Sequence, residues 1–170
     1  IGSNKKALAA AKKTAEERGL SAYILSDAIH SEACEVGKWL AEKALAGKRA
    51  PGGGQKSLCM ISGGETTVAV QGKGLGGRNM ELALAFAIEI DGIDGITLLS
   101  AGTDGTDGPT DAAGAIVDGK TADRAKTAGL DPGEYLDNNA SYTFFSRAGG
   151  LFVTGPTGTN VMDIQIVVID

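Results

Sequence analysis

The sequence is poor in the side chains on which several kinds of functional site depend. Aromatic residues make up 5% of its 170 residues, which leaves little material for stacking bases or sugar rings. His30 is the single histidine, so a Ser-His-Asp triad or a multi-histidine metal site has little to be built from. The net charge is -5, and no run of lysine and arginine is longer than two residues. We therefore expect no binding of nucleic acid.

Long hydrophobic runs and cysteines are scarce as well. No apolar run approaches the roughly 20 residues that span a bilayer, and no signal-peptide core opens the chain. Cys34 and Cys59 fall in an apolar helix pattern and an apolar strand pattern, where thiols serve as small hydrophobic groups. These features predict a soluble, cytoplasmic protein with no membrane partner. Because Ile1 stands where a methionine would begin the chain, we also expect that a segment upstream has been removed.

Glycine is abundant, with 26 residues at about twice the usual frequency of roughly 7%. The glycines separate apolar helix patterns from apolar strand patterns, and this alternation predicts an α/β protein with helices layered on a mixed, largely parallel sheet. The patterns predict helices over 5–18, 31–46, 79–90, 121–128 and 141–148, and strands over 21–25, 57–61, 66–70, 96–99, 115–117, 151–153 and 161–169. Asp131 and Pro132 begin a predicted turn, with Asp131 as its cap and Pro132 at the N1 position.

Three segments follow from this division. Residues 1–46 form a helical and strand segment, residues 47–56 a linker rich in glycine and proline, and residues 57–170 the main α/β domain. The linker assignment rests on the high entropy of glycine and on the steric restrictions of proline.

The loop from Ser100 to Gly114 is the strongest candidate site, because it follows the most buried strand, where open α/β sheets place their ligands. It carries three carboxylates within eight residues, and their mutual repulsion favours a bound cation or backbone N–H groups as partners. Oxygen ligands favour magnesium or calcium. A simple turn is the competing interpretation. An EF-hand is rejected, since the loop lacks the glutamate at position 12. The loop residues concerned are Thr103, Asp104, Asp107 and Asp111.

Two further loops combine glycine with polar side chains. The loop at 154–160 lies between two apolar strands and suits phosphate or carboxylate oxygens, although a plain hairpin turn explains it equally well. The glycine-rich stretch at 72–77 leads Arg78 and Asn79 to a helix N-terminus, where the backbone favours an anion. Arg78 is then a clamp for phosphate or carboxylate, and the alternative is a solvated arginine beside an ordinary cap.

Several linked strings, in order, resemble the glycerate 2-kinase family and, within it, the C-terminal MOFRL domain. The strings are SGGETTV at 62–68, GKGLGGRNMELALA at 72–85, LLSAGTDGTDGPTDAAGAIVDG at 98–119, NNASYTFF at 138–145 and VTGPTGTNVMDI at 153–164. The resemblance runs from about Ser57 to the C-terminus. It departs from the family pattern at Met80, where glutamine is common, and at Ala140, where aspartate is often found.

The resemblance implies transfer of the γ-phosphoryl group of ATP to glycerate, giving 2-phosphoglycerate, with Mg²⁺. It implies a cleft shared with a missing N-terminal domain of the same chain, and it leaves a homo-oligomer open. The catalytic residues implied are Arg78, Asp104 and Asp107, with Asp104 and Asp107 also as metal ligands. The residues implied to bind substrate or phosphate are Gly63, Gly64, Glu65, Thr66, Asn79, Glu81, Thr103, Asp111, Gly155, Thr157, Gly158 and Asn160.

Two other functions stay open at this point. Members of the family are also named hydroxypyruvate reductase, which would use NAD(P), but the stretch at 72–77 matches a dinucleotide fingerprint only in part. An isolated half of a cleft could also serve as a non-catalytic module that binds a ligand or a partner.

Overall fold

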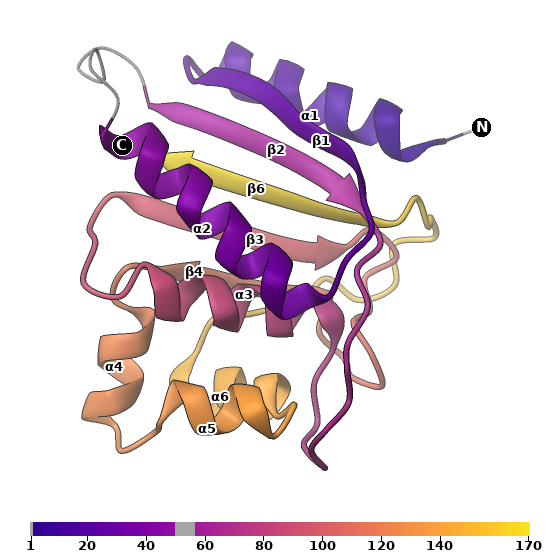
Figure 1. Cartoon of the computed structure of the whole chain (residues 1–170). Coiled ribbons are helices and arrows are strands. Elements are labelled where there is room, and N and C mark those ends of the chain that lie inside the picture. The colour runs from indigo at the N-terminus through magenta and orange to yellow at the C-terminus, as the bar shows by residue number, and fades with distance from the viewer. Residues whose placement is uncertain (1, 50–56) are drawn as a thin grey trace.

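The computed structural model describes residues 2–49 and 57–170, which form six helices and a six-stranded sheet within these ranges (Figure 1). In chain order the elements are α1 (Asn4–Glu17), β1 (Ser21–Ile29), α2 (Ala33–Arg49), β2 (Leu58–Gly64), α3 (Arg78–Glu89), β3 (Ile96–Gly102), β4 (Gly114–Asp118), α4 (Thr121–Thr127), α5 (Pro132–Asp137), α6 (Ser141–Ala148), β5 (Leu151–Phe152) and β6 (Asp163–Ile169). The α/β class is confirmed.

The sheet has the strand order β1-β2-β6-β3-β4-β5. Only β1 and β2 pair in parallel, and each of the other four pairs is antiparallel. The mixed sheet is therefore confirmed, but its largely parallel character was wrong. The last strand, β6, lies between β2 and β3 and opposes both. A mostly apolar run such as 96–99 carries no information on the direction of the neighbouring strands, and Thr97 within it is exposed.

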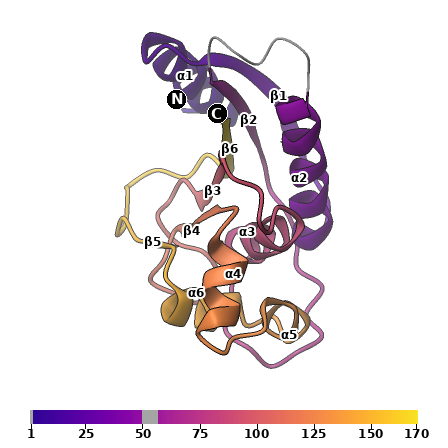
Figure 2. The same cartoon turned by 90° about the vertical axis from the view of Figure 1, so that its left-hand side faces the viewer.

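Helices cover the two faces of the sheet unequally (Figure 2). Helix α1 packs alone on one face, where its Leu8 and Ala15 contact Cys59 and Ile61 of β2. Helices α2 and α3 pack on the other face, over the larger core. Strand β6 contributes side chains to the cores on both faces of the sheet, because its residues alternate between buried and half-buried along its length.

Helix α3 is the central helix, buried from Asn79 to Ala87. It lies between the sheet and the helices α2, α5 and α6, as its nearly uniform apolar sequence predicts. This burial fixes the position of Arg78, its first residue. The helix therefore delivers Arg78 from a rigid element.

Local signals explain most element ends. The Ser3 hydroxyl accepts a hydrogen bond from the backbone N–H of Lys6 and caps α1. Asp131 caps α5 in the same way, with Pro132 at its first position, as predicted. No helix among the described residues is long and apolar enough to cross a membrane.

Two predicted segments differ from the structure. Residues 66–70 form no strand, and Thr67 makes a single bridge to Glu32, because no neighbouring strand runs alongside them. Residues 47–49 of the predicted linker belong to the last turn of α2. Residues 50–56 of that linker lie outside the described part of the chain.

Candidate functional site

The polar loops lie together at one end of the central strands, which we call this edge of the sheet, where β2 and β3 end and β6 begins (Figure 1). Gly64 at the end of β2 and Gly102 at the end of β3 both pair with Asp163, the first residue of β6. Three strands thus bring Asp163 between the loops that follow β2 and β3. This placement makes Asp163 the centre of the candidate site.

Arg78 binds Asp163 in a bidentate ion pair. Its Nε lies 2.7 Å from Oδ2 of Asp163 and its Nη2 lies 2.9 Å from Oδ1. The Asp163 side chain has no exposed surface, and the hydrogen bond to it raises the pKa of Arg78 further above its usual range. The third nitrogen, Nη1, is 3.5 Å from Glu65. Arg78 is therefore a permanent cation, and the pair of its Nη1 with the exposed Glu65 is the one that a ligand could replace.

The start of β6 is held from the opposite side by Asn4. The Asn4 side-chain amide donates hydrogen bonds to the backbone oxygens of Val161, at 2.8 Å, and Asp163, at 3.0 Å. Asn4 is buried, so these bonds are made away from solvent, where they are strongest. Helix α1 therefore helps to fix the position of the Arg78–Asp163 pair.

Asp107 has a different partner, the N-terminus of α3. Its Oδ1 accepts a hydrogen bond from the backbone N–H of Asn79 at 3.0 Å, and its Oδ2 accepts one from Met80 at 2.8 Å. Asp107 is 2% exposed, and burial raises the pKa of its carboxyl while these bonds lower it. The anion expected at this helix N-terminus is thus supplied by the protein itself.

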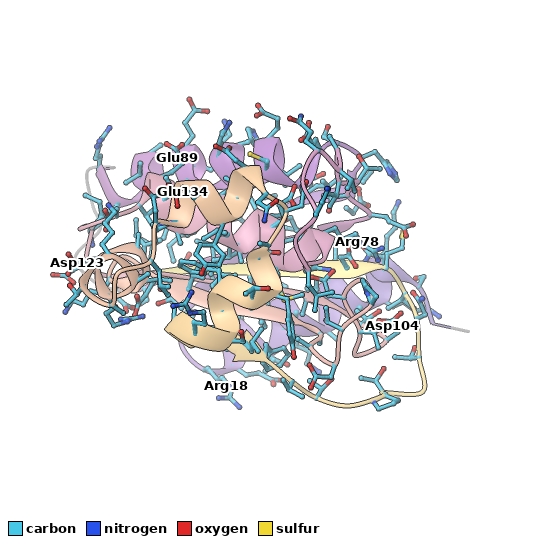
Figure 3. All side chains as sticks on the ribbon, turned by 90° about the horizontal axis from the view of Figure 1, so that it is seen from below. Arg18, Arg78, Glu89, Asp104, Asp123 and Glu134 are labelled. Atoms are coloured by element: carbon cyan, nitrogen blue, oxygen red, sulfur yellow. The ribbon has the colours of Figure 1, made fainter. Side chains whose placement is uncertain are left out.

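Asp104 lies on the surface of the same loop, beside the loop at 154–160. Its Oδ1 accepts a hydrogen bond from the N–H of Thr106 at 3.0 Å, and its Oδ2 accepts one from the Asn160 amide at 3.2 Å. A side chain at Gly102 would meet Asp104 and Asp163 together, so these two carboxylates flank the end of β3. Figure 3 shows Arg78 and Asp104 at the same end of the molecule, far from Asp123.

The loops after β3 and before β6 interlock. Thr103 donates a hydrogen bond to the backbone oxygen of Met162 at 2.7 Å, and Thr157 donates one to the oxygen of Thr103 at 2.5 Å. Gly105 has a φ of 89° and abuts the oxygen of Gly155, so only glycine fits there. The two loops form one wall of the site.

Asp111 points elsewhere. Its carboxylate accepts a hydrogen bond from the hydroxyl of Tyr142 at 2.8 Å, on the surface. The predicted cluster of three carboxylates is therefore dispersed: Asp104 faces the wall of the site, Asp107 caps α3 and Asp111 binds α6. The turn interpretation holds for Asp107 and Asp111.

The glycine-rich stretch at 71–77 is packed in place by Asn138 and Asn139. Asn139 Oδ1 accepts hydrogen bonds from the N–H groups of Gln71 and Gly72, both at 2.8 Å. A side chain at Gly72 or Gly74 would collide with the backbone of residues 138–140. These glycines permit close packing against residues 138–140.

A cavity of about 410 Å³ lies between this stretch and α3. Its lining residues include Thr66, Arg78 and Glu81 from the predicted set. Glu81 is buried and accepts a hydrogen bond from the Asn139 amide at 2.9 Å. Burial raises the pKa of the Glu81 carboxyl above its ordinary value.

The structure brings most of the predicted residues to this edge, in three groups. Gly63 and Gly64 end β2, and Glu65 and Thr66 follow it. Arg78, Asn79 and Glu81 lie in the first turn of α3. The interlocked wall contains Thr103, Asp104, Gly155, Thr157, Gly158 and Asn160. Asn79 is fully buried and accepts a hydrogen bond from the Ser100 hydroxyl at 2.8 Å, so its side chain supports the core. Asp111 lies outside the groups.

Sequence reasoning missed Asp163, Asn4 and Asn139. Asp163 had a signal, because it is in phase with the buried residues Gln165 and Val167 of β6, and a buried carboxylate requires a partner. Asn4 and Asn139 had none beyond their residue type, since each acts on a segment more than 60 residues away in sequence.

A preformed metal cage is absent from the described residues, where no three His, Cys, Asp or Glu side chains converge. In both Asp104 and Asp107 the two carboxylate oxygens accept hydrogen bonds, but Asp107 is buried whereas Asp104 is only half-buried and so more accessible to a metal ion. Asp104 fits, since magnesium is commonly held by one or two carboxylates together with substrate phosphates. The metal roles of Asp104 and Asp107 stay predictions, and the accessibility of Asp104 favours it.

Fold and site together define an α/β domain that presents an anchored arginine and interlocked glycine-rich loops at one edge of a mixed sheet. A family model described as the MOFRL family matches residues 58–163. The chain belongs to the MOFRL family, which confirms the resemblance found in its sequence.

Named relatives agree with this assignment. A D-glycerate 2-kinase of Thermotoga maritima is 50% identical over 99% of this chain and 40% of its own length. A putative hydroxypyruvate reductase of Agrobacterium vitis is 42% identical over 99% of this chain and 44% of its own length. A crystal structure of a glycerate kinase from Thermotoga maritima matches with a TM-score of 0.96 and 49% identity, over 99% of this chain and 41% of that one. The chain thus spans about two fifths of these relatives.

Proposed function

We propose that this chain is the C-terminal part of an ATP-dependent glycerate 2-kinase, which phosphorylates glycerate to 2-phosphoglycerate in the cytoplasm. The observation that carries the proposal is the match to the Thermotoga maritima D-glycerate 2-kinase, which extends over 99% of the chain at 50% identity. Because the chain spans two fifths of that relative, the proposal includes a further, N-terminal domain that completes the cleft.

Arg78 has the central role in the proposed reaction. Phosphoryl transfer depends mainly on positioning and on neutralising the charge that develops on oxygen. Arg78 keeps its charge because Asp163 binds Nε and Nη2. In this proposal Nη1 exchanges its exposed partner Glu65 for an oxygen of the transferring phosphoryl group or of the substrate. The pair lies on rigid elements, which limits the movement of the guanidinium during the reaction.

Asp104 supplies the reactive carboxylate. It lies beside Asp163 at the end of β3 and is held by Thr106 and Asn160. Two roles for Asp104 were inferred from the sequence: it binds magnesium on the ATP phosphates, or it accepts the proton of the glycerate hydroxyl. Both roles need the negative charge of its carboxylate. Magnesium, when bound, neutralises phosphate charge during transfer. Asp107 has no catalytic role in this proposal, because it caps α3.

The competing function is that of an NAD(P)-dependent hydroxypyruvate reductase, which the name of the Agrobacterium vitis relative favours. A dinucleotide fold binds pyrophosphate at the N–H groups that open a helix. In α3 the N–H groups of Asn79 and Met80 already donate to Asp107. A dinucleotide phosphate would have to displace a buried carboxylate, so the kinase is the better-supported function.

The test is an assay of the full-length protein with ATP, magnesium and glycerate, in which enolase consumes the product. Enolase accepts 2-phosphoglycerate directly, so signal without a phosphoglycerate mutase identifies the 2-kinase. Oxidation of NADH by hydroxypyruvate, with no ATP-dependent product from glycerate, would reverse the ranking. Calorimetry of the 170-residue chain with Mg-ATP and with glycerate then tells whether it binds ligands alone, as a non-catalytic module would.

A further inference from the structure

The cavity between the glycine-rich stretch at 71–77 and α3 has the features of a ligand site. Its volume of about 410 Å³ falls in the range of small-molecule pockets. Apolar side chains, among them Val68, Leu75 and Pro109, share its lining with a few polar ones. A mostly apolar wall with a small number of placed polar groups is the usual composition of such sites.

Thr66 is the first unusual feature of this cavity. It is 3% exposed, and its hydroxyl has no hydrogen-bond partner among the described residues. A buried hydroxyl without a partner destabilises the folded state, because it loses its hydrogen bonds to water. A threonine kept at this cost beside a cavity is accounted for if a ligand supplies the missing partner.

Glu81 is the second unusual feature of this cavity. Its Oε2 accepts a hydrogen bond from Asn139, and within the described ranges its Oε1 has none. Arg78 is one helical turn before Glu81 on α3, so both side chains lie on the same face, about 5–6 Å apart at their Cβ atoms. The lining of the cavity thus includes the paired cation Arg78, the carboxylate of Glu81 with one oxygen unbonded, and Thr66, whose buried hydroxyl has no partner among the described residues.

We propose that this cavity binds the acceptor of the reaction, a short hydroxy acid, with its carboxylate on Arg78 and its unphosphorylated 3-hydroxyl on Thr66 and Glu81. The inference rests on the proposed kinase function and adds the position and orientation of glycerate. A 2-kinase must leave the 3-hydroxyl untouched, and binding it away from the reacting atoms does so. The hydroxyl of the ligand donates to Oε1 of Glu81 and accepts from Oγ1 of Thr66.

The first experiment replaces Thr66 with valine in the full-length protein. Thr66→Val keeps the shape and removes the unpartnered hydroxyl, so the melting temperature should equal or exceed that of the wild type. The KM for glycerate and its calorimetric Kd should rise about 3- to 10-fold, the value of one lost hydrogen bond, with the KM for ATP unchanged. Thr97→Val, an exposed site on β3, is the matched control and should change neither constant.

A second readout separates ligand binding from structural support. Lactate lacks the 3-hydroxyl, so the wild type should bind glycerate more tightly than lactate, and Thr66→Val should narrow that difference. Glu81→Gln keeps an acceptor for Asn139 and should also narrow the difference in affinity between glycerate and lactate. Glu89→Gln, at the exposed end of α3, should leave that difference unchanged.

The outcomes distinguish this inference from the proposed function. Absence of kinase activity overturns the kinase, and the cavity is still tested by the calorimetry of glycerate and lactate. Wild-type activity with an unchanged glycerate KM and Kd in Thr66→Val overturns the cavity assignment alone. A change confined to the KM for ATP also overturns it, because it would place the nucleotide in the cavity.

Discussion

At the scale of single residues, neighbouring carboxylates in one loop do different work because their partners differ. Asp104 accepts a hydrogen bond from Asn160 in the wall of the site. Asp107 accepts hydrogen bonds from the N-terminus of α3, and Asp111 accepts one from the hydroxyl of Tyr142. The buried carboxylate that matters most to Arg78, Asp163, comes from another part of the chain. Proximity in sequence is thus a poor guide to shared function among charged residues.

Glu81 gives a prediction at this scale. Burial raises the pKa of its carboxyl above its ordinary value, as do the charges of Glu32 and Asp107, while the hydrogen bond from Asn139 lowers it. The unfolded chain therefore loses this proton first as pH rises, and the contribution of Glu81 to stability, full below its unfolded pKa, is lost as pH rises through its folded pKa. Glu81→Gln should thus gain stability relative to the wild type as pH rises from about 4 to about 7.

The measurement is urea unfolding of both chains across this pH range, with Glu89→Gln as the exposed control on the same helix. A constant difference in the free energy of unfolding between wild type and Glu81→Gln would contradict the prediction. Combined with the loss of glycerate affinity expected above, a gain in stability would mark Glu81 as a residue kept for binding.

A physical limit determines which individual residues could be predicted from the sequence. The loop at 100–114 and Arg78 could be placed from sequence, because strand ends and helix starts follow from local patterns. The Arg78–Asp163 pair could not, since it joins residues 85 positions apart through a strand order that no local pattern contains. The same holds for Asn139 and the stretch at 71–77.

At the scale of elements, α3 depends on a cap that lies outside its own sequence neighbourhood. Gly77, at its N-cap position, makes no side-chain hydrogen bond, and Asp107 supplies the cap from the loop after β3. This links the position of Arg78 to the conformation of that loop. The helix and the loop should therefore be stabilised together.

Asp107→Ala tests this link. Removing the cap leaves two buried N–H groups of α3 unpaired, which should cost about 2 kcal/mol in the free energy of unfolding. Asp111→Ala, in the same loop but on the surface, should stay within about 0.5 kcal/mol of the wild type. Denaturant unfolding of the three chains decides the matter, and equal stability of both variants would contradict the assignment of Asp107 as a cap.

At the scale of the whole molecule, the helices and most strands followed from periodicity, but the sheet did not. The position of β6 between β2 and β3 joins the last segment of the chain to its centre, and this insertion makes the sheet mostly antiparallel. It also brings Asp163 to Arg78. The site therefore exists only once the C-terminal strand has been added to the sheet.

The central claim is that Arg78 and Asp104, at this edge, carry out phosphoryl transfer in the full-length protein. The most direct test is the kcat of Asp104→Asn with glycerate and ATP, which removes the charge and keeps the size of the side chain. The account predicts a fall of about 100-fold or more, the contribution of a catalytic carboxylate, with unchanged thermal stability. A kcat within about threefold of the wild type would contradict it.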